Sequence, residues 1–286
     1  MIVFDSKFQA FRQPVMPTGV PRRQLILNLA GVGFKIDPVN RSQLALCFAG
    51  YEDLPEYTGN TPGTADGVRI SAVNTPIVSL GIRPEEIREE KALFLRHWQD
   101  KGAEIPFMDD YWHEINALRR KMLTVLIEHQ IIQLHGSAIC VDGQGVLFTA
   151  PSGTGKSTHS RLWRERFGKE VIMINDDKPL IRVTDDGILI CGAPWNGKHR
   201  LGRQIAAPLR AVVRLRRGEA NEISPLDNAG AFRELFLQTY QFRDREKMQR
   251  VISVLARIIE DVPCYSLLCN MEPEAAEVAR EGLRGI

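Results

Sequence analysis

The sequence predicts an α/β protein in which a mixed sheet flanked by helices follows a smaller β-rich or α+β region at the N-terminus. Three observations lead to this fold class. A short apolar run, residues 146–148, passes through a glycine-rich segment into a helix-like segment, residues 158–167. Several further apolar runs follow, separated by turn residues, as expected for strands of one sheet. Residues 108–130 repeat apolar side chains every three or four positions, which is typical of an amphipathic helix.

Length and composition indicate a globular protein with a substantial core. The chain has 286 residues, of which 44% are hydrophobic, enough for one large or two modest domains. The net charge of +2 creates no overall field, so we expect neither a nucleic-acid partner nor a membrane partner. Charged side chains interrupt the first twelve residues, so we expect no signal peptide and a cytoplasmic location.

The N-terminal region, residues 1–105, carries strand-like pieces but no catalytic constellation. We expect it to pack on the following domain, residues 106–286, or to help recognise a substrate. The charged segment at 85–91 is interpreted as a solvated helix face. The expected strands of the region are residues 24–29, 33–37 and 67–73, with a turn-rich segment at 57–66.

A hairpin is predicted directly before the glycine-rich segment. Residues 131–141 read as one strand, and Asp-Gly-Gln-Gly at 142–145 supplies the turn into the apolar run at 146–148. Pairing of these strands would bring His135 close to the end of the sheet where the glycine-rich segment begins.

The segment Ala-Pro-Ser-Gly-Thr-Gly-Lys-Ser at 150–157 has the pattern of a phosphate-binding P-loop, with Ala150 at a position usually held by glycine. In such a loop, backbone N–H groups and a helix N-terminus surround phosphate oxygens. A lysine reaches the outer phosphates and a hydroxyl joins the Mg²⁺ shell. The sequence therefore predicts a site for ATP or another nucleotide with Mg²⁺. Its candidate binding residues are Ser152, Gly153, Thr154, Gly155, Lys156, Ser157 and Thr158.

Two carboxylates end the next predicted strand. The apolar residues 171–174 are followed by Asn175, Asp176 and Asp177. Beside a P-loop, one such carboxylate can hold Mg²⁺ while the other accepts the proton of an attacking hydroxyl. The alternative is an ordinary Asp-Asp turn that opens a loop.

A glycine-rich cationic loop, residues 192–203, follows a predicted hairpin at 180–191. Its side chains Lys198, His199, Arg200 and Arg203 suit a developing phosphoryl charge, although a solvated surface loop would have the same composition. The remaining expected elements are a strand at 209–216, helices within 226–260, a strand at 262–268 and a helix at 272–283.

These motifs together resemble the catalytic domain of HPr kinase/phosphorylase and its relatives, and more distantly ATP-dependent phosphoenolpyruvate carboxykinase. The resemblance covers roughly residues 130–270. The resemblance rests on four motifs, which are His-Gly-Ser-Ala at 135–138, the P-loop at 152–158, Asn-Asp-Asp at 175–177 and Gly-Ala-Pro-Trp-Asn-Gly-Lys at 192–198.

The resemblance implies roles for individual residues. Ser157 and Asp177 would support Mg²⁺, Asp176 would be the general base toward a serine hydroxyl, and His135 would tune the carboxylate or contact phosphate. Lys198 would lie in the catalytic loop. His199 stands where related proteins often carry Glu, which leaves phosphorolysis and the number of metal ions open.

The sequence therefore predicts a nucleotide-dependent kinase that phosphorylates a hydroxyl, with a serine of a protein or peptide as the leading acceptor. A small-molecule acceptor and a non-catalytic nucleotide-binding regulator are the alternatives. The N-terminal region has no motif that matches the HPr enzyme's own N-terminal domain, so HPr need not be the acceptor. A homo-oligomer is compatible with the resemblance.

Overall fold

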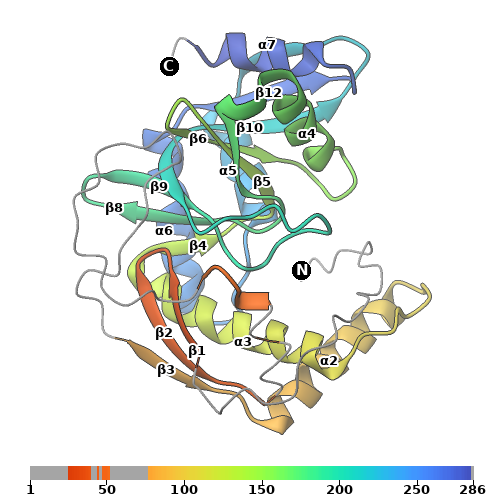
Figure 1. The fold of residues 1–286 in the computed structure, drawn as a ribbon, viewed down its shortest axis with the longest axis vertical. Helices are drawn as coiled ribbons and strands as arrows, with labels where there is room; N and C mark the ends of the chain where they lie inside the picture. The colour runs from red at the N-terminus through yellow and green to blue at the C-terminus, as the bar shows by residue number, and fades with distance from the viewer. Residues whose placement is uncertain (1–24, 40–43, 45–46, 52–76, 285–286) are drawn as a thin grey trace. The chain divides into compact units, whose positions relative to one another are not determined.

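The computed structural model describes residues 25–39, 44, 47–51 and 77–284, which fall into two compact units (Figure 1). The first holds the described residues up to 125, and the second holds residues 126–284. The expected strand at 67–73, the turn-rich segment at 57–66 and the first twelve residues lie outside the described residues.

Unit 1 is an α+β arrangement of a small sheet and two helices. Its core includes the fully buried side chains of Leu27, Phe34 and Phe48. Phe94 packs edge-on against Trp112, with ring centroids 5.0 Å apart, and so joins the two helices. The elements are β1 (Leu25–Leu29), β2 (Val32–Asp37), β3 (Val78–Gly81), α2 (Pro84–Asp100) and α3 (Asp110–Leu126).

The charged segment at 85–91 belongs to α2 and is only partly solvated. Glu90 is buried and forms an ion pair with Arg120 of α3 at 2.6 Å. Ile87 is also buried, whereas Glu85 and Arg88 pair with one another on the exposed face. The helix begins with a capping box in which the Arg83 amide donates to Glu86 Oε2.

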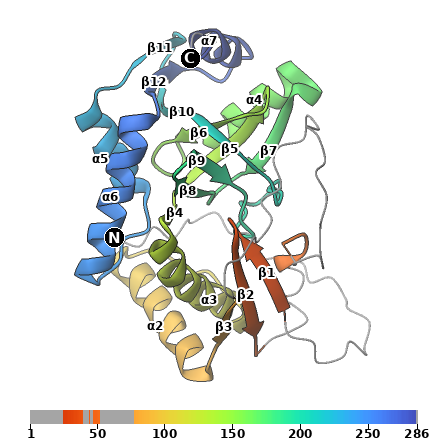
Figure 2. The ribbon, with the colours of Figure 1, turned by 90° about the vertical axis from the view of Figure 1, so that its left-hand side faces the viewer.

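Unit 2 is a mixed sheet with helices on both faces, as expected from the sequence (Figure 2). Among its described residues the sheet has nine strands in the order β4-β8-β9-β10-β6-β5-β7, with β12 beside β10 and β11 beside β12. The strands are β4 (Ile131–Gln133), β5 (Gly136–Val141), β6 (Gln144–Thr149), β7 (Val171–Asn175), β8 (Leu180–Thr184), β9 (Gly187–Cys191), β10 (Ala206–Arg217), β11 (Glu222–Pro225) and β12 (Cys264–Cys269).

Helices α5 (Asn228–Gln238) and α6 (Arg245–Asp261) cover one face of this sheet, and α4 (Lys156–Phe167) and α7 (Glu274–Gly282) cover the other. Strand side chains alternate between the two faces. In β5, Cys140 packs under α6, whereas Ile139 packs under α4. The strands are apolar on both sides because helices cover both faces.

The predicted hairpin into the glycine-rich loop is confirmed. Val141 pairs with Gln144, and Asp142 and Gly143 adopt positive φ of 52° and 75°, as a tight hairpin turn requires. At the other end of the hairpin Gly136 pairs with Thr149, the last residue before the loop.

The single strand expected at 131–141 is wrong, because the chain breaks into β4 and β5 at Leu134 and His135. β4 pairs with β8, whereas β5 pairs with β6 and β7. The amides of these two residues donate to Pro179 O and Gln238 O. These two amides are therefore paired although neither belongs to the hydrogen bonds of β4 or β5. The break places His135 at the start of β5.

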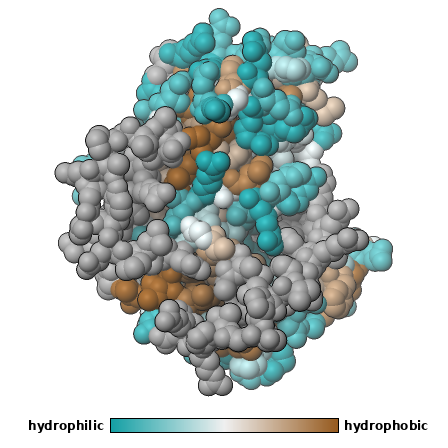
Figure 3. Space-filling model, in the orientation of Figure 1, coloured by the Kyte–Doolittle hydropathy of each residue, from teal (hydrophilic) through white to brown (hydrophobic). Residues whose placement is uncertain are grey.

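None of the described helices is long and apolar enough to cross a membrane. In the view of Figure 3, hydrophilic residues predominate over α4 and α7. The described part of unit 2 exposes few large apolar side chains, and these are Leu237, Ile252 and Met271.

A buried imidazole makes unit 2 sensitive to acid. His159 of α4 accepts a hydrogen bond from Trp163 Nε1 at 3.0 Å and contacts Phe148 edge-on. Burial lowers the pKa of His159 to about 4 from an ordinary value of 6.5. The unfolded chain therefore takes up this proton first as the pH falls, and stability decreases between these two values.

We expect the shifted pKa of His159 to lower the free energy of unfolding by about 2 kcal/mol when the pH falls from about 7.5 to about 5. Urea titrations at both pH values should show a correspondingly smaller loss for His159→Gln, which keeps an acceptor for Trp163 but does not titrate. His199→Gln is the control, since that imidazole is exposed. An equal decrease in the free energy of unfolding in the parent and in His159→Gln would contradict the prediction.

Candidate active site

The candidate residues meet at one edge of the sheet in unit 2. β6 and β7 both pair antiparallel with β5, so they run in the same direction and end at the same edge. β10 is parallel to β6 and ends there too. The glycine-rich loop, the Asp176–Asp177 pair and the start of β5 at His135 are thereby brought together, and the hairpin prediction had placed His135 beside the loop.

The glycine-rich loop leads directly into α4. Gly153 and Gly155 have φ of 82° and 128°, in the region that favours glycine, so side chains at these positions would strain the backbone. The helix begins at Lys156, whose ammonium donates to Ala150 O at 2.7 Å and Pro151 O at 3.3 Å. The lysine is buried within its own loop.

The remaining loop residues are more accessible. Ser152 and Ser157 are exposed, and Thr154 and Thr158 are partly buried. Arg217, at the end of β10, holds the loop from outside. Its guanidinium donates to Thr154 O at 3.1 Å and also to Gly153 O.

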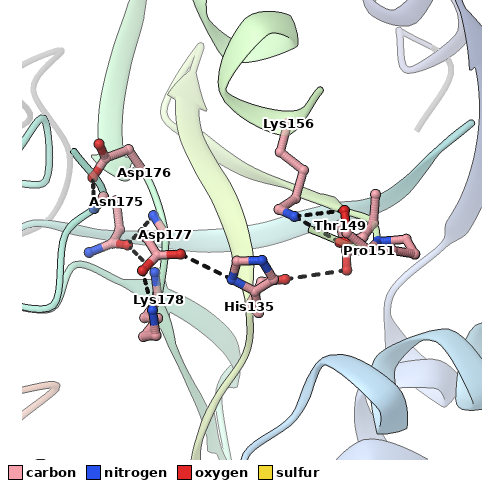
Figure 4. Close-up of polar contacts among 10 residues, drawn as sticks. His135, Thr149, Pro151, Lys156, Asn175, Asp176, Asp177 and Lys178 are labelled. Atoms are coloured by element: carbon pink, nitrogen blue, oxygen red, sulfur yellow. Dashed lines mark hydrogen bonds and ion pairs between the residues drawn. The ribbon is translucent and has the colours of Figure 1, made fainter. Parts of the chain in front are cut away.

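The two aspartates are both buried but differ in their partners (Figure 4). Asp177 Oδ1 lies 3.0 Å from His135 Nδ1, and Oδ2 accepts a hydrogen bond from Lys178 Nζ. Asp176 Oδ1 accepts from the Gly197 amide at 2.9 Å. In Figure 4 the Asp177 carboxylate faces the imidazole, whereas that of Asp176 is turned away from it.

These environments move the two pKa values in opposite directions. Burial raises the pKa of Asp176, and the charge of Asp177 raises it further against the opposing hydrogen bond from Gly197. Burial alone would also raise the pKa of Asp177, but Lys178 and His135 hold it well below its usual range. Such a separation is typical of carboxylates with different roles in acid–base chemistry.

Asn175 shapes the turn that carries both carboxylates. Its Oδ1 accepts from the amides of Asp177 at 2.9 Å and Lys178 at 2.6 Å, which forms an Asx turn. Its Nδ2 donates to Ala193 O at 2.8 Å, so the turn is tied to the start of the 192–203 loop.

The 192–203 loop lies against the aspartate turn. The Arg203 amide donates to Ile174 O, and a Cβ on Gly197 would lie 3.1 Å from Asp176 Oδ2. Lys198 and His199 are exposed. Only the backbone of this loop reaches Asp176 in the hydrogen bonds given above, so a role for Lys198 stays a prediction.

No protein-family model matches the sequence. No curated protein sequence matches it either. Among solved structures, this structure is similar to that of the Hpr(Ser) kinase/phosphatase from Coxiella burnetii, with 12% sequence identity. The match covers 54% of this chain and 93% of that chain, with a TM-score of 0.30. This is a distant similarity of fold.

Sequence reasoning named Asn175 without giving it a role, and it missed Lys178, Arg217 and Glu234 around the site. Asn175 carried a usable signal, because an asparagine at a strand end often forms an Asx turn. Lys178 and Arg217 had no such signal, since surface cations are common. Glu234 lies on α5, almost eighty residues after Lys156, and only tertiary packing brings it near the loop.

Proposed function

We propose that unit 2 is a nucleotide-dependent kinase that transfers a phosphoryl group to a hydroxyl, with a serine of a protein or peptide as the acceptor. The supporting observation is the pair of buried aspartates with oppositely shifted pKa values, on the same sheet edge as a glycine-rich loop and its buried lysine. A phosphate loop alone would equally suit a nucleotide sensor. The aspartate pair favours transfer because it offers a proton acceptor beside the phosphates.

Asp176 is the proposed general base. Its raised pKa brings the carboxylate closer to the range in which a base works efficiently. The acceptor oxygen would form a bond to the γ-phosphorus while the bond to the β-phosphate oxygen breaks, with the proton passing to Asp176. The products are a phosphorylated hydroxyl and the nucleoside diphosphate.

Asp177 and His135 have a supporting role in this proposal. Asp177 stays ionised, and its hydrogen bond holds His135 Nδ1. The opposite nitrogen, Nε2, is buried without a hydrogen-bond partner in the described part of the chain. The imidazole is thus oriented by the carboxylate and keeps one nitrogen for a phosphate or hydroxyl.

The donor set fits Mg²⁺ that arrives with a nucleotide. Mg²⁺ prefers oxygen ligands and is usually held by one or two carboxylates together with phosphates and water. Within the described residues no cluster of three or more His, Cys, Asp or Glu could hold a metal by itself. Ser157, exposed on the first turn of α4, and Asp177 would hold the ion, which would neutralise charge on the phosphates.

A labelling experiment tests the function. The protein is incubated with ATP labelled at the γ-phosphate and a lysate separated into macromolecular and small-molecule fractions. We expect label in a protein or peptide serine, and none when ATP carries its label at the α-phosphate. Label confined to small molecules would overturn the protein acceptor, and nucleotide binding without turnover would overturn the kinase. The cytoplasmic location and a homo-oligomer stay predictions from the sequence.

A further inference from the structure

An ion pair between a buried carboxylate and a partly exposed guanidinium lies next to the start of the phosphate loop, on the sheet face covered by α5. Arg214 of β10 and Glu234 of α5 approach to 3.1 Å between Nε and Oε2. Glu234 is only 5% exposed, whereas Arg214 is partly exposed. In the β10–β6 register Arg214 lies opposite Thr149, the residue directly before Ala150.

The pair interacts electrostatically with the lysine of the loop. Burial raises the pKa of Glu234, and the charges of Arg214 and Lys156 act against that rise. The Thr149 hydroxyl interacts with the same carboxylate. Arg214 is the cation within ion-pair distance of this buried anion, while Lys156 donates to the loop carbonyls of Ala150 and Pro151.

An ion pair that only stabilises the fold could lie anywhere in unit 2, whereas this pair lies beside the phosphate loop. A buried carboxylate close to a phosphate site opposes the binding of a polyanion, and an adjacent arginine offsets that effect. Since burial reduces solvent screening, removal of one charge should change the local potential more than removal of a surface charge.

We infer that Arg214 and Glu234 are positioning residues that act through Lys156 and set the affinity of the phosphate loop for nucleoside polyphosphates. The charge of Glu234 weakens binding, whereas the charge of Arg214 offsets that of Glu234 and strengthens binding. The inference rests on the proposed function, because it requires the loop to bind a nucleotide.

Charge-neutral variants of the two residues should have opposite effects. Binding of a non-hydrolysable ATP analogue with Mg²⁺ is measured by calorimetry. We expect Glu234→Gln to bind about tenfold more tightly and Arg214→Gln about tenfold more weakly. The double variant and Arg214→Lys, which keeps the charge, should bind like the parent. Glu165→Gln removes an exposed α4 ion pair with Arg161 and is the control, expected to leave affinity unchanged.

A merely structural pair gives a different result. Both single variants would then lose thermal stability and weaken binding in the same direction, which would overturn the inference. Unchanged affinity in all variants would also overturn it. If a single variant fails to fold, the double variant and Arg214→Lys still decide, since affinity far from that of the parent contradicts the inference. Failure of the parent protein to bind the analogue would instead overturn the proposed nucleotide site.

Discussion

Replacement of Asp176 by asparagine is expected to lower the rate of phosphoryl transfer about a thousandfold, with nucleotide affinity changed by less than about threefold. The amide has nearly the same shape and still accepts the Gly197 hydrogen bond, but it cannot take up the acceptor's proton. Single-turnover transfer from labelled ATP to the identified acceptor measures the first effect, and calorimetry measures the second.

The pH dependence gives an independent test of the same role. Because the pKa of Asp176 is raised by burial, the base gains its proton at a higher pH than an ordinary aspartate, and the transfer rate should fall as the pH falls through that value. The residual rate of the asparagine variant should not show this decrease as the pH falls.

The chain offers a matched control. Asp185 and Asp186 form a second Asp-Asp pair, exposed in the β8–β9 turn. Asp186→Asn should leave both transfer and binding unchanged. An Asp176→Asn variant that transfers phosphate at the parental rate would remove the base assignment, whatever its nucleotide affinity.

Replacement of Lys156 by methionine is expected to weaken nucleotide binding by at least about a hundredfold, because a charge-assisted contact to phosphate is lost in a poorly solvated site. Methionine retains the apolar stem, so the substitution chiefly removes the ammonium. The same change deletes the hydrogen bonds to Ala150 O and Pro151 O, so the thermal midpoint of the nucleotide-free protein should fall as well.

Calorimetric titration with the non-hydrolysable analogue and Mg²⁺ measures the binding loss. Lys169→Met serves as the control, since this lysine is exposed just beyond the other end of α4. It should bind like the parent. Parental affinity in Lys156→Met would contradict the assignment of 150–157 as a phosphate loop.

Much of the fold was predictable because its signals are local. The hairpins at 136–149 and 180–191, the strand β10 and the helices of unit 2 follow from apolar runs, periodicity and turn residues. The Asp142–Gly143 turn and the positive φ of Gly153 and Gly155 are likewise local properties of the backbone.

Other features have no local signal. The break at Leu134 and His135 occurs inside a run with strand character, and it results from hydrogen bonds to Pro179 and Gln238, which are distant in sequence. The sequence singles out the Asp176–Asp177 pair over Asp185–Asp186 by its place beside the P-loop, but it does not show how the environments of the two pairs differ. Burial at the sheet edge and the partners His135 and Lys178 make the difference.

The sequence by itself determined the α/β class of unit 2, the course of the chain through the glycine-rich loop into α4, and the choice of candidate residues, since each depends on residues close together in the chain. Only the tertiary structure decided that Asp177 stays ionised while the pKa of Asp176 rises, and that Arg214 and Glu234 lie near Lys156. These properties arise from burial and from charges on separate elements, so they exist only once the sheet has formed and its helices have packed.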